Sequence, residues 1–392
     1  MAKFLFFFSL GVVFYSYIGY GVIVLLLVKL KHLLCNPRAM SPGRFEPEIT
    51  LVVAAFDEAD FIEEKIKNSL ALDYQTGKLH WIFITDGSGD QTPDIIRNYP
   101  QIQLLHHPER RGKVAAMNRA MQFVRTPFVI FSDANTLLNS LCVKEIVKHY
   151  SDPRVGGVAG EKKIMKTESG RAPGAGEGMY WKYESLLKKM DSELYSVVGA
   201  AGELFSLRTS LFYVAPENTI IEDFVQSMKI CMQGYVIRYE ANALATEHAS
   251  ATMREEQKRK IRIAAGAFQA MVILKGLFNV FRYPILSFQF ISHRILRWTL
   301  CPLCLVVCLV SNAWLLVVDS SEFYLVFFLM QTVFYAAAWA GWILANRNLK
   351  IKAFYLPYYF VFMNLSVFAG FYRWVRNKQS AIWEKAARHN PV

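Results

Sequence analysis

The chain has 392 residues, which is enough for one sizeable domain and a membrane part. Hydrophobic residues make up 53% of it and charged residues 19%, and this balance excludes an ordinary soluble protein of the same length. The net charge of +12 favours contact with anionic lipid headgroups and an anionic substrate over nucleic-acid binding, because the apolar residues gather in long uncharged runs.

Four apolar runs have about the 20 residues that an α-helix needs to cross a bilayer. They cover residues 4–28, 298–318, 323–345 and 353–372. Basic residues, and no cleavage signal, follow the first run, so we expect a retained N-terminal anchor over residues 1–30. Basic residues also precede the second run, and the positive-inside rule therefore places the intervening domain in the cytosol.

The C-terminal part leaves two topologies open. Residues 294–374 predict about three transmembrane helices, and a fourth full crossing would put the basic tail at 375–392 outside. The alternative is that one run does not span fully, and Pro357 in the last run allows a broken or re-entrant segment. Before these runs, residues 264–293 predict an amphipathic helix at the membrane interface, with a core helix of the domain as the alternative.

Strands and helices alternate in the domain between the first two runs. Short apolar runs predict strands at 49–56, 80–85, 102–106 and 128–132, with helices at 61–72, 92–98 and 112–123. Less regular segments follow, with strands expected at 155–158, 199–207 and 235–239 and helices at 179–190 and 223–234. This order predicts an α/β domain over residues 45–263, with a mostly parallel sheet and helices on both faces.

Acidic side chains follow three of the predicted strands. Asp57 follows the first strand, Asp86 the second and Asp133 the fourth. The carboxyl ends of parallel strands meet at one edge of a sheet, where such sheets bind their ligands. The sequence therefore predicts one site that these three carboxylates share.

Taken in order, residues 49 to about 263 resemble the family 2 glycosyltransferases. The resemblance is to the membrane-integrated branch with cellulose, hyaluronan and poly-N-acetylglucosamine synthases and ceramide glucosyltransferases. It rests on Asp57, Asp86-Gly87, Gly112-Lys113, Asp133-Ala134-Asn135, Glu222-Asp223 and Arg259 with Arg262. It implies a GT-A fold and an inverting enzyme of the inner (plasma) membrane, multi-pass, with its catalytic domain in the cytosol. The implied donor is a nucleotide-sugar, expected to be a UDP-sugar, and the acceptor a glycan or a lipid-linked group.

The resemblance also implies roles at the donor site. Asp57 and Asp86 are expected to bind the nucleobase and ribose, although the family usually has Asn at the position of Asp57. The alternative for Asp86 is an Asx-turn residue. Lys113 follows a glycine at a helix start, where free backbone N–H groups suit a phosphate, and we assign it to the diphosphate. The alternative for Lys113 is a solvated basic turn.

Asp133-Ala134-Asn135 stands where the family has Asp-X-Asp, and the resemblance implies Mg²⁺ or Mn²⁺ held by Asp133 and Asn135. Such ions take oxygen ligands and neutralise the charge that develops on a leaving diphosphate. Because Asn135 is neutral, we expect the ion to rely on the donor's phosphates to complete its shell. The alternative is a turn that only ends the strand.

Asp223 matches the family's catalytic base, which takes the proton from the acceptor hydroxyl. The alternative is helix capping, since an acidic first turn complements the helix dipole. Arg259 and Arg262 are spaced i and i+3, so they share one helix face and suit a diphosphate. The alternative for this pair is contact with anionic lipid. Glu203 and Trp181 are weaker candidates for acceptor contacts.

Three departures from the family pattern motivate a second function. Asn135 and Ile221 replace residues of the family motifs, and Ile263 stands where polysaccharide synthases have a tryptophan against the acceptor sugar. The loss of that tryptophan weakens the case for a long-chain polymerase. The alternative function is a catalytically degenerate membrane subunit of a glycan assembly or export complex.

Overall fold

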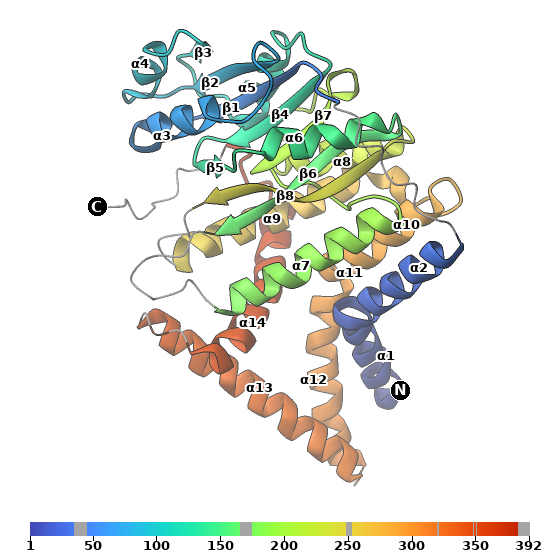
Figure 1. The fold of residues 1–392 in the computed structure, drawn as a ribbon. Helices are drawn as coiled ribbons and strands as arrows, with labels where there is room; N and C mark the ends of the chain where they lie inside the picture. The colour runs from blue at the N-terminus through green and yellow to red at the C-terminus, as the bar shows by residue number, and fades with distance from the viewer. Residues whose placement is uncertain are drawn as a thin grey trace.

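The structure is a computed structural model that describes residues 1–34, 45–164, 175–247, 253–319, 321–347, 349 and 351–382. It has two parts: an α/β domain, and a set of helices that extend from one side of it (Figure 1). The mostly parallel sheet with flanking helices is confirmed, as are the apolar helices near both ends of the chain.

The domain contains an eight-stranded sheet in the order β3-β2-β1-β4-β7-β6-β8-β5. The neighbours β1–β2, β1–β4, β2–β3 and β6–β8 are parallel, and β4–β7, β6–β7 and β5–β8 are antiparallel. The strands are β1 Ile49–Ala55, β2 Leu79–Asp86, β3 Ile102–His107, β4 Phe128–Asp133, β5 Thr136–Leu138, β6 Val155–Ile164, β7 Leu204–Arg208 and β8 Val236–Glu247.

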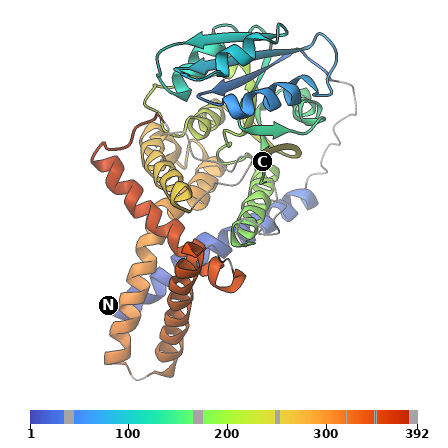
Figure 2. The same cartoon turned by 90° about the vertical axis from the view of Figure 1, so that its left-hand side faces the viewer.

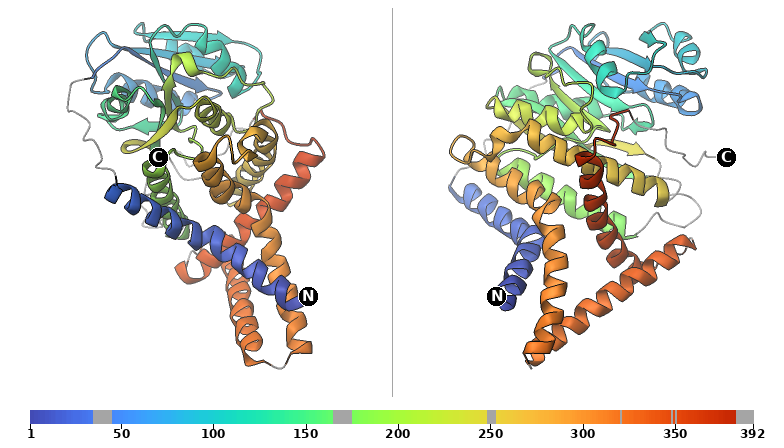
Figure 3. Two further views of the ribbon diagram at one scale, coloured as in Figure 1. Left: turned by 90° about the vertical axis from the view of Figure 1, so that its right-hand side faces the viewer. Right: turned by 180° about the vertical axis from the view of Figure 1, so that it is seen from behind.

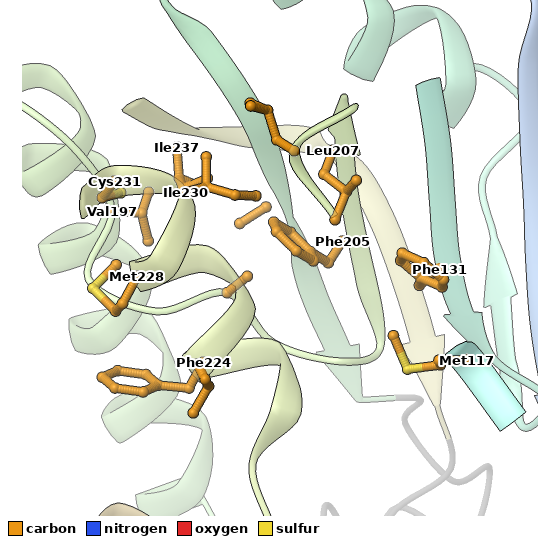
Figure 4. Packing of buried hydrophobic residues seen from close by; sticks show 14 of the residues in the cluster. Met117, Phe131, Val197, Phe205, Leu207, Phe224, Met228, Ile230, Cys231 and Ile237 are labelled. Atoms are coloured by element: carbon orange, nitrogen blue, oxygen red, sulfur yellow. The ribbon is translucent and has the colours of Figure 1, made fainter. Parts of the chain in front are cut away.

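Alternating side chains of the central strands build two cores, one on each face of the sheet. In β4, Val129 and Phe131 join a core with α5 (Lys113–Met121) and α8 (Glu222–Met232), part of which is seen in Figure 4. Ile130 points the other way, to a core with α3 (Ala59–Leu70), α4 (Thr92–Arg97) and α6 (Cys142–Val147). This period of two fixes which helices cover which face.

The remaining helices lie within the domain or connect it to the apolar helices. Those in or against the domain are η2 Lys148–Ser151, α7 Ala175–Leu194, η3 Thr209–Leu211, α9 Met253–Ile273, η4 Lys275–Phe278, α10 Pro284–Phe290, η5 Ile291–Ile295 and α11 Leu296–Trp298. The basic stretch at 254–262 and the apolar stretch after it form one helix, α9. The predicted boundary between residues 263 and 264 therefore falls inside a helix.

Among the residues that the structure describes, four helices are long and apolar enough to cross a membrane: residues 2–34, α12 (Leu300–Val318), α13 (Glu322–Asn346) and α14 (Lys352–Val375). The first is continuous through α1 (Ala2–Phe14), η1 (Tyr15–Gly19) and α2 (Tyr20–Leu34). Helices α12 and α13 lead away from the sheet and meet at the end farthest from it (Figures 2 and 3).

Helix α14 turns back toward the domain and packs on α9 near both of its ends. Tyr355, near its start, has its hydroxyl 3.6 Å from the sulfur of Met253. Near its end, the ring of Trp374 stacks on Phe268, with centroids 5.8 Å apart. Because α9 packs on the domain, both ends of α14 lie on the domain's side of the helices. This geometry favours the predicted alternative in which the last apolar run does not span.

Buried charges join the N-terminal helix, α7 and the helices before α12. Arg297 donates to Glu184 over 2.5 Å. Tyr20 donates to Asp191 over 2.5 Å, and His293 Nδ1 lies 2.6 Å from the same carboxylate. Each charged group has a buried partner of opposite charge or a hydrogen bond, as burial requires. The apolar helices are thus held to the domain by specific polar contacts.

Candidate active site

A cleft of about 520 Å³ lies between the carboxyl ends of β1 and β4 and the helix α9. Its lining residues come from segments far apart in the sequence, including the starts of α5 and α8 and the segment after α14. Among the predicted site residues, it brings together Lys113, Asp133, Asn135, Glu203, Asp223, Arg259 and Arg262.

Asp133 is the last residue of β4, and its carboxylate is paired with a lysine. Lys113 Nζ donates to Asp133 Oδ1 over 2.7 Å and lies 3.2 Å from Glu222 Oε1. Burial acts to lower the pKa of Lys113, but the carboxylates of Asp133, Glu222 and Asp223 raise it above its ordinary value. The Lys113 ammonium is therefore charged, and it neutralises an acidic pocket.

A second lysine lies beneath the turn that carries Asp133 and Asn135. Lys65 on α3 is fully buried, and its Nζ donates to Ser132 Oγ and to the Thr136 carbonyl, each over 2.7 Å. Burial lowers the pKa of Lys65 to about 7, and the nearby Asp133 opposes that shift. Lys65 thus braces both sides of the turn from within the core. Lys65 was not predicted as a site residue, although it falls on the apolar stripe of α3 with Ile62 and Ile66.

Asp86 and Asp57 shape the loops beside the cleft and are not among its lining residues. Asp86 Oδ2 accepts hydrogen bonds from the backbone N–H groups of Arg111 and Gly112, over 2.9 and 2.6 Å. Its Oδ1 is buried and accepts no hydrogen bond from the described residues. Asp57 has φ of 51° and accepts from Gly89 N–H over 2.8 Å. Asn and Asp tolerate this left-handed conformation best among non-glycine residues, which accounts for an Asp where Asn is usual.

Asp223 lies in the first turn of α8 and lines the cleft. Its Oδ1 accepts from the Phe224 N–H over 2.8 Å, and with Glu222 it makes the first turn of the helix acidic, while the N-cap Ile221 makes no side-chain hydrogen bond. Burial, followed by the neighbouring Glu222 carboxylate, raises the pKa of Asp223 to about 7, while Lys113 opposes the shift. A carboxylate with this pKa is suited to accept a proton near neutral pH. A place in the acidic first turn and a role as base are therefore compatible.

Arg259 and Arg262 face the cleft from α9, and Arg259 is surrounded by acidic side chains. Arg259 lies 3.8 Å from Glu203 and 3.5 Å from Glu247. Glu203 also accepts a hydrogen bond from Lys162 over 2.6 Å. Burial acts to raise the pKa of Glu203, but the positive charges of Lys162 and Arg259 hold that pKa well below its usual range. This ion-paired carboxylate positions Arg259. Trp181, the other weak acceptor candidate, has a side chain outside the described residues.

The segment after α14 returns to the same cleft. Arg373 and residues 378–382 line the cleft. Ile382 packs against Gly112, since a Cβ added to Gly112 would lie 3.4 Å from Ile382 Cγ1. The chain reverses at Asn377, which has φ of 50°. This segment was predicted only as part of a basic tail at 375–392, of which residues 383–392 lie outside the described residues. No local pattern signals a return over about 245 residues of intervening sequence from Asp133.

Comparison with known proteins agrees with this architecture. Residues 50–213 match the family model described as Glycosyl transferase family 2. A poly-beta-1,6-N-acetyl-D-glucosamine synthase of Staphylococcus aureus (strain MSSA476) is 27% identical over 263 residues, which are 64% of this chain and 62% of the relative. The synthase of the same name from Staphylococcus epidermidis is 24% identical over 278 residues, covering 68% and 66%. The match thus spans less than two thirds of these relatives' length.

Among solved structures, the mannosyltransferase PcManGT from Pyrobaculum calidifontis, in complex with GDP-Man and Mn²⁺, has a TM-score of 0.71. It is 21% identical, and the match covers 96% of this chain and 100% of that chain. At this identity the likeness establishes the fold, and it extends over the apolar helices as well as the sheet. Residues 50–213 therefore form a domain that matches the glycosyltransferase family 2 model, and the chain has the GT-A fold.

Proposed function

We propose that the chain is an inverting glycosyltransferase that moves a sugar from a nucleotide-sugar, expected to be a UDP-sugar, to a membrane-associated acceptor. The acceptor would be a glycan or a lipid-linked group. The observation that carries the proposal is the cleft itself. It combines a carboxylate with a raised pKa, a carboxylate–amide pair and cationic side chains that include Lys113, Arg259 and Arg262, beside helices apolar enough to enter a membrane.

In the proposed reaction, Asp223 takes the proton of the acceptor hydroxyl. The acceptor oxygen then forms a bond to the anomeric carbon while the bond from that carbon to the diphosphate oxygen breaks, and the nucleoside diphosphate leaves. Lys113, Arg259 and Arg262 would hold the diphosphate, because guanidinium and ammonium groups bind phosphate oxygens well. Asp86 Oδ1, which lies 4.0 Å from Arg119 Nη1 but accepts no hydrogen bond from the described residues, would accept a hydrogen bond from the nucleoside.

Asp133 and Asn135 would hold a Mg²⁺ or Mn²⁺ ion. Both line the cleft, and oxygen ligands suit these ions. Within the part of the chain that the structure describes, no cluster of three or more His, Cys, Asp or Glu side chains offers a metal site, so the donor's phosphates would supply further ligands. Bound there, the ion would neutralise charge on the diphosphate. Because Lys113 occupies Asp133 Oδ1, we expect weak ion binding without donor.

The proposed location is the inner (plasma) membrane, with the catalytic domain in the cytosol. Nucleotide-sugars are cytosolic substrates in this proposal, and the cleft and the end of α14 share one side. The names of the staphylococcal relatives support a glycan product, and the ligands of the mannosyltransferase support a nucleotide-sugar donor with a divalent cation.

A panel of radiolabelled nucleotide-sugars tests the proposal. The full chain, purified in detergent, is incubated with each donor and with Mg²⁺ or Mn²⁺, and the products are sized. We expect transfer from one donor, dependent on the ion. Failure to transfer or hydrolyse any donor would overturn the proposal, and donor binding without turnover would favour the degenerate subunit.

A further inference from the structure

A second hollow, of about 480 Å³, lies on the opposite side of α9 from the catalytic cleft. Met253, Arg254, Gln257 and Ile261 of α9 line it. Glu255, Lys258, Arg259 and Arg262 of the same helix line the cleft. Helix α9 thus separates the two hollows and turns one face toward each of them. We call the second hollow the α9–α13–α14 groove, after the helices that form it.

The walls of this groove are apolar and aromatic. Helix α13 contributes Tyr335, Trp339 and Trp342, and α14 contributes residues such as Phe362 and Leu365. Trp339 is 64% exposed and Trp342 48% exposed, on a helix with the length and composition of a membrane span. Large apolar side chains this exposed are stable where hydrocarbon surrounds them. The groove therefore faces lipid, and acyl chains fit its walls.

One end of the groove is polar and cationic. Arg254 is the second residue of α9 and Asn346 the last of α13, and both line the groove together with Gln257. No lining residue is acidic. The Arg254 guanidinium is exposed and forms no ion pair with any residue that the structure describes. A guanidinium with neutral hydrogen-bonding neighbours is complementary to a phosphate.

From this charge and these walls, we propose that the α9–α13–α14 groove binds an anionic membrane phospholipid. Its headgroup phosphate contacts Arg254, and an acyl chain lies along Trp339 and Trp342. The occupant is not the acceptor of the sugar, because α9 separates Arg254 from Asp223. It is a structural lipid that packs on one face of α9, while the opposite face of α9 presents Arg259 and Arg262 to the donor. This last consequence rests on the proposed function, whereas the lipid site does not.

Tryptophan quenching tests the lipid site directly. The full chain is placed in nanodiscs that contain brominated phosphatidylglycerol or brominated phosphatidylcholine, each diluted in unlabelled phosphatidylcholine. We expect stronger quenching by the brominated phosphatidylglycerol, and expect the difference to disappear in a Trp339→Phe, Trp342→Phe variant. The Arg254→Gln variant should lower the preference for phosphatidylglycerol roughly fivefold, the effect of one basic residue near an anionic surface. Arg282→Gln removes a basic residue outside the groove and should leave the preference unchanged.

Three outcomes would overturn the proposal. Equal quenching by the two lipids would remove the anionic preference, and an unchanged preference in Arg254→Gln would remove the headgroup contact. Protection from quenching by a soluble oligosaccharide would assign the aromatic walls to a glycan. Sugar transfer is measured on the same nanodiscs, and we expect it to rise with phosphatidylglycerol in the parent and less so in Arg254→Gln. If quenching is selective but no donor is turned over, the lipid site stands and the proposed function fails.

Discussion

Asp223 has a pKa of about 7 because it is buried and lies beside Glu222. A carboxylate base accepts a proton only when it is deprotonated, so we expect turnover to fall as the pH drops below about 7, about tenfold per unit. Above pH 7, Asp223→Asn should lower turnover by roughly 10²- to 10⁴-fold, and the variant should lose the acid limb that this carboxylate causes. The measurement is kcat against pH with the best donor.

Glu222→Gln is the matched variant for this prediction. It removes the neighbouring negative charge that helps to raise the pKa of Asp223, and the pKa should therefore fall. The acid limb of the pH profile should move to lower pH while the base itself remains. An Asp223→Asn enzyme with full turnover would remove the base assignment, whatever the position of the limb.

Lys65 acts on the Asp133–Asn135 turn through its hydrogen bonds to Ser132 and Thr136. Lys65→Met keeps the length of the side chain but removes both buried hydrogen bonds that its Nζ donates, to Ser132 Oγ and to the Thr136 carbonyl. We expect the affinity for Mn²⁺, measured by electron paramagnetic resonance of free Mn²⁺ in the presence of UDP, to fall roughly 10- to 100-fold. Lys67→Met, on the exposed face of the same helix, is the control and should bind Mn²⁺ normally. Equal affinities in the two variants would contradict the bracing role.

At the scale of the elements, Gly370 sets how closely α14 approaches α9. A Cβ at this position would lie 2.5 Å from the Cβ of Ala264 and 2.8 Å from the backbone nitrogen of Ala265. Gly370→Ala must therefore move α14 outward, at a cost of about 1–3 kcal/mol of stability. We expect a lower thermal midpoint in detergent and faster tryptic cleavage after Arg376. Gly11→Ala, where the added methyl meets nothing within 4 Å, should change neither.

Whether a helix or strand was predicted from the sequence depends on whether its own residues carry the pattern that forms it. The strands that end at Asp86 and Asp133 were predictable because buried parallel strands are short apolar runs followed by polar turns. Strand β5 was missed, because three residues are too few for a periodic pattern, and the six-residue helix α6 was missed as well. The start of α9 was misplaced because its surroundings change along its length. Its first half faces two hollows, whereas Ala264, Ala265 and Ala267 are buried.

The cleft was predictable only in part, because local structure places some of its residues and tertiary contacts place the others. The strand-end residue Asp133 and the helix-start residue Asp223 stand at positions where the fold itself exposes side chains to a ligand, and the structure brings them to one cleft. The pairing of Arg259 with Glu203 and Glu247 depends on tertiary contacts between distant strands and helices. The return of residues 378–382 depends on the packing of α14 against α9. Such contacts leave no signal in a single sequence.

For the whole molecule, the path of α14 decides on which side of the membrane the chain ends. If residues 2–34, α12 and α13 cross and α14 does not, there are three crossings. The loop at Asp319–Glu322 is then outside, and Arg373 and Lys378 are inside with the domain. This arrangement satisfies the positive-inside rule at every basic cluster, whereas four crossings would place the basic C-terminal segment outside. The contacts of Tyr355 and Trp374 with α9, near both ends of α14, support the same prediction.

Cysteine labelling in intact cells checks this topology. In a background without the six native cysteines, we expect Ser321→Cys to react with a membrane-impermeant maleimide added outside. Ser380→Cys should react only after the membrane is permeabilised, because Ser380 lines the same cleft as Asp133. The two variants control for each other, since each should be protected where the other is labelled. Labelling of Ser380→Cys from outside would mean that α14 crosses, and the contact between residues 378–382 and the donor cleft could not then exist in the membrane.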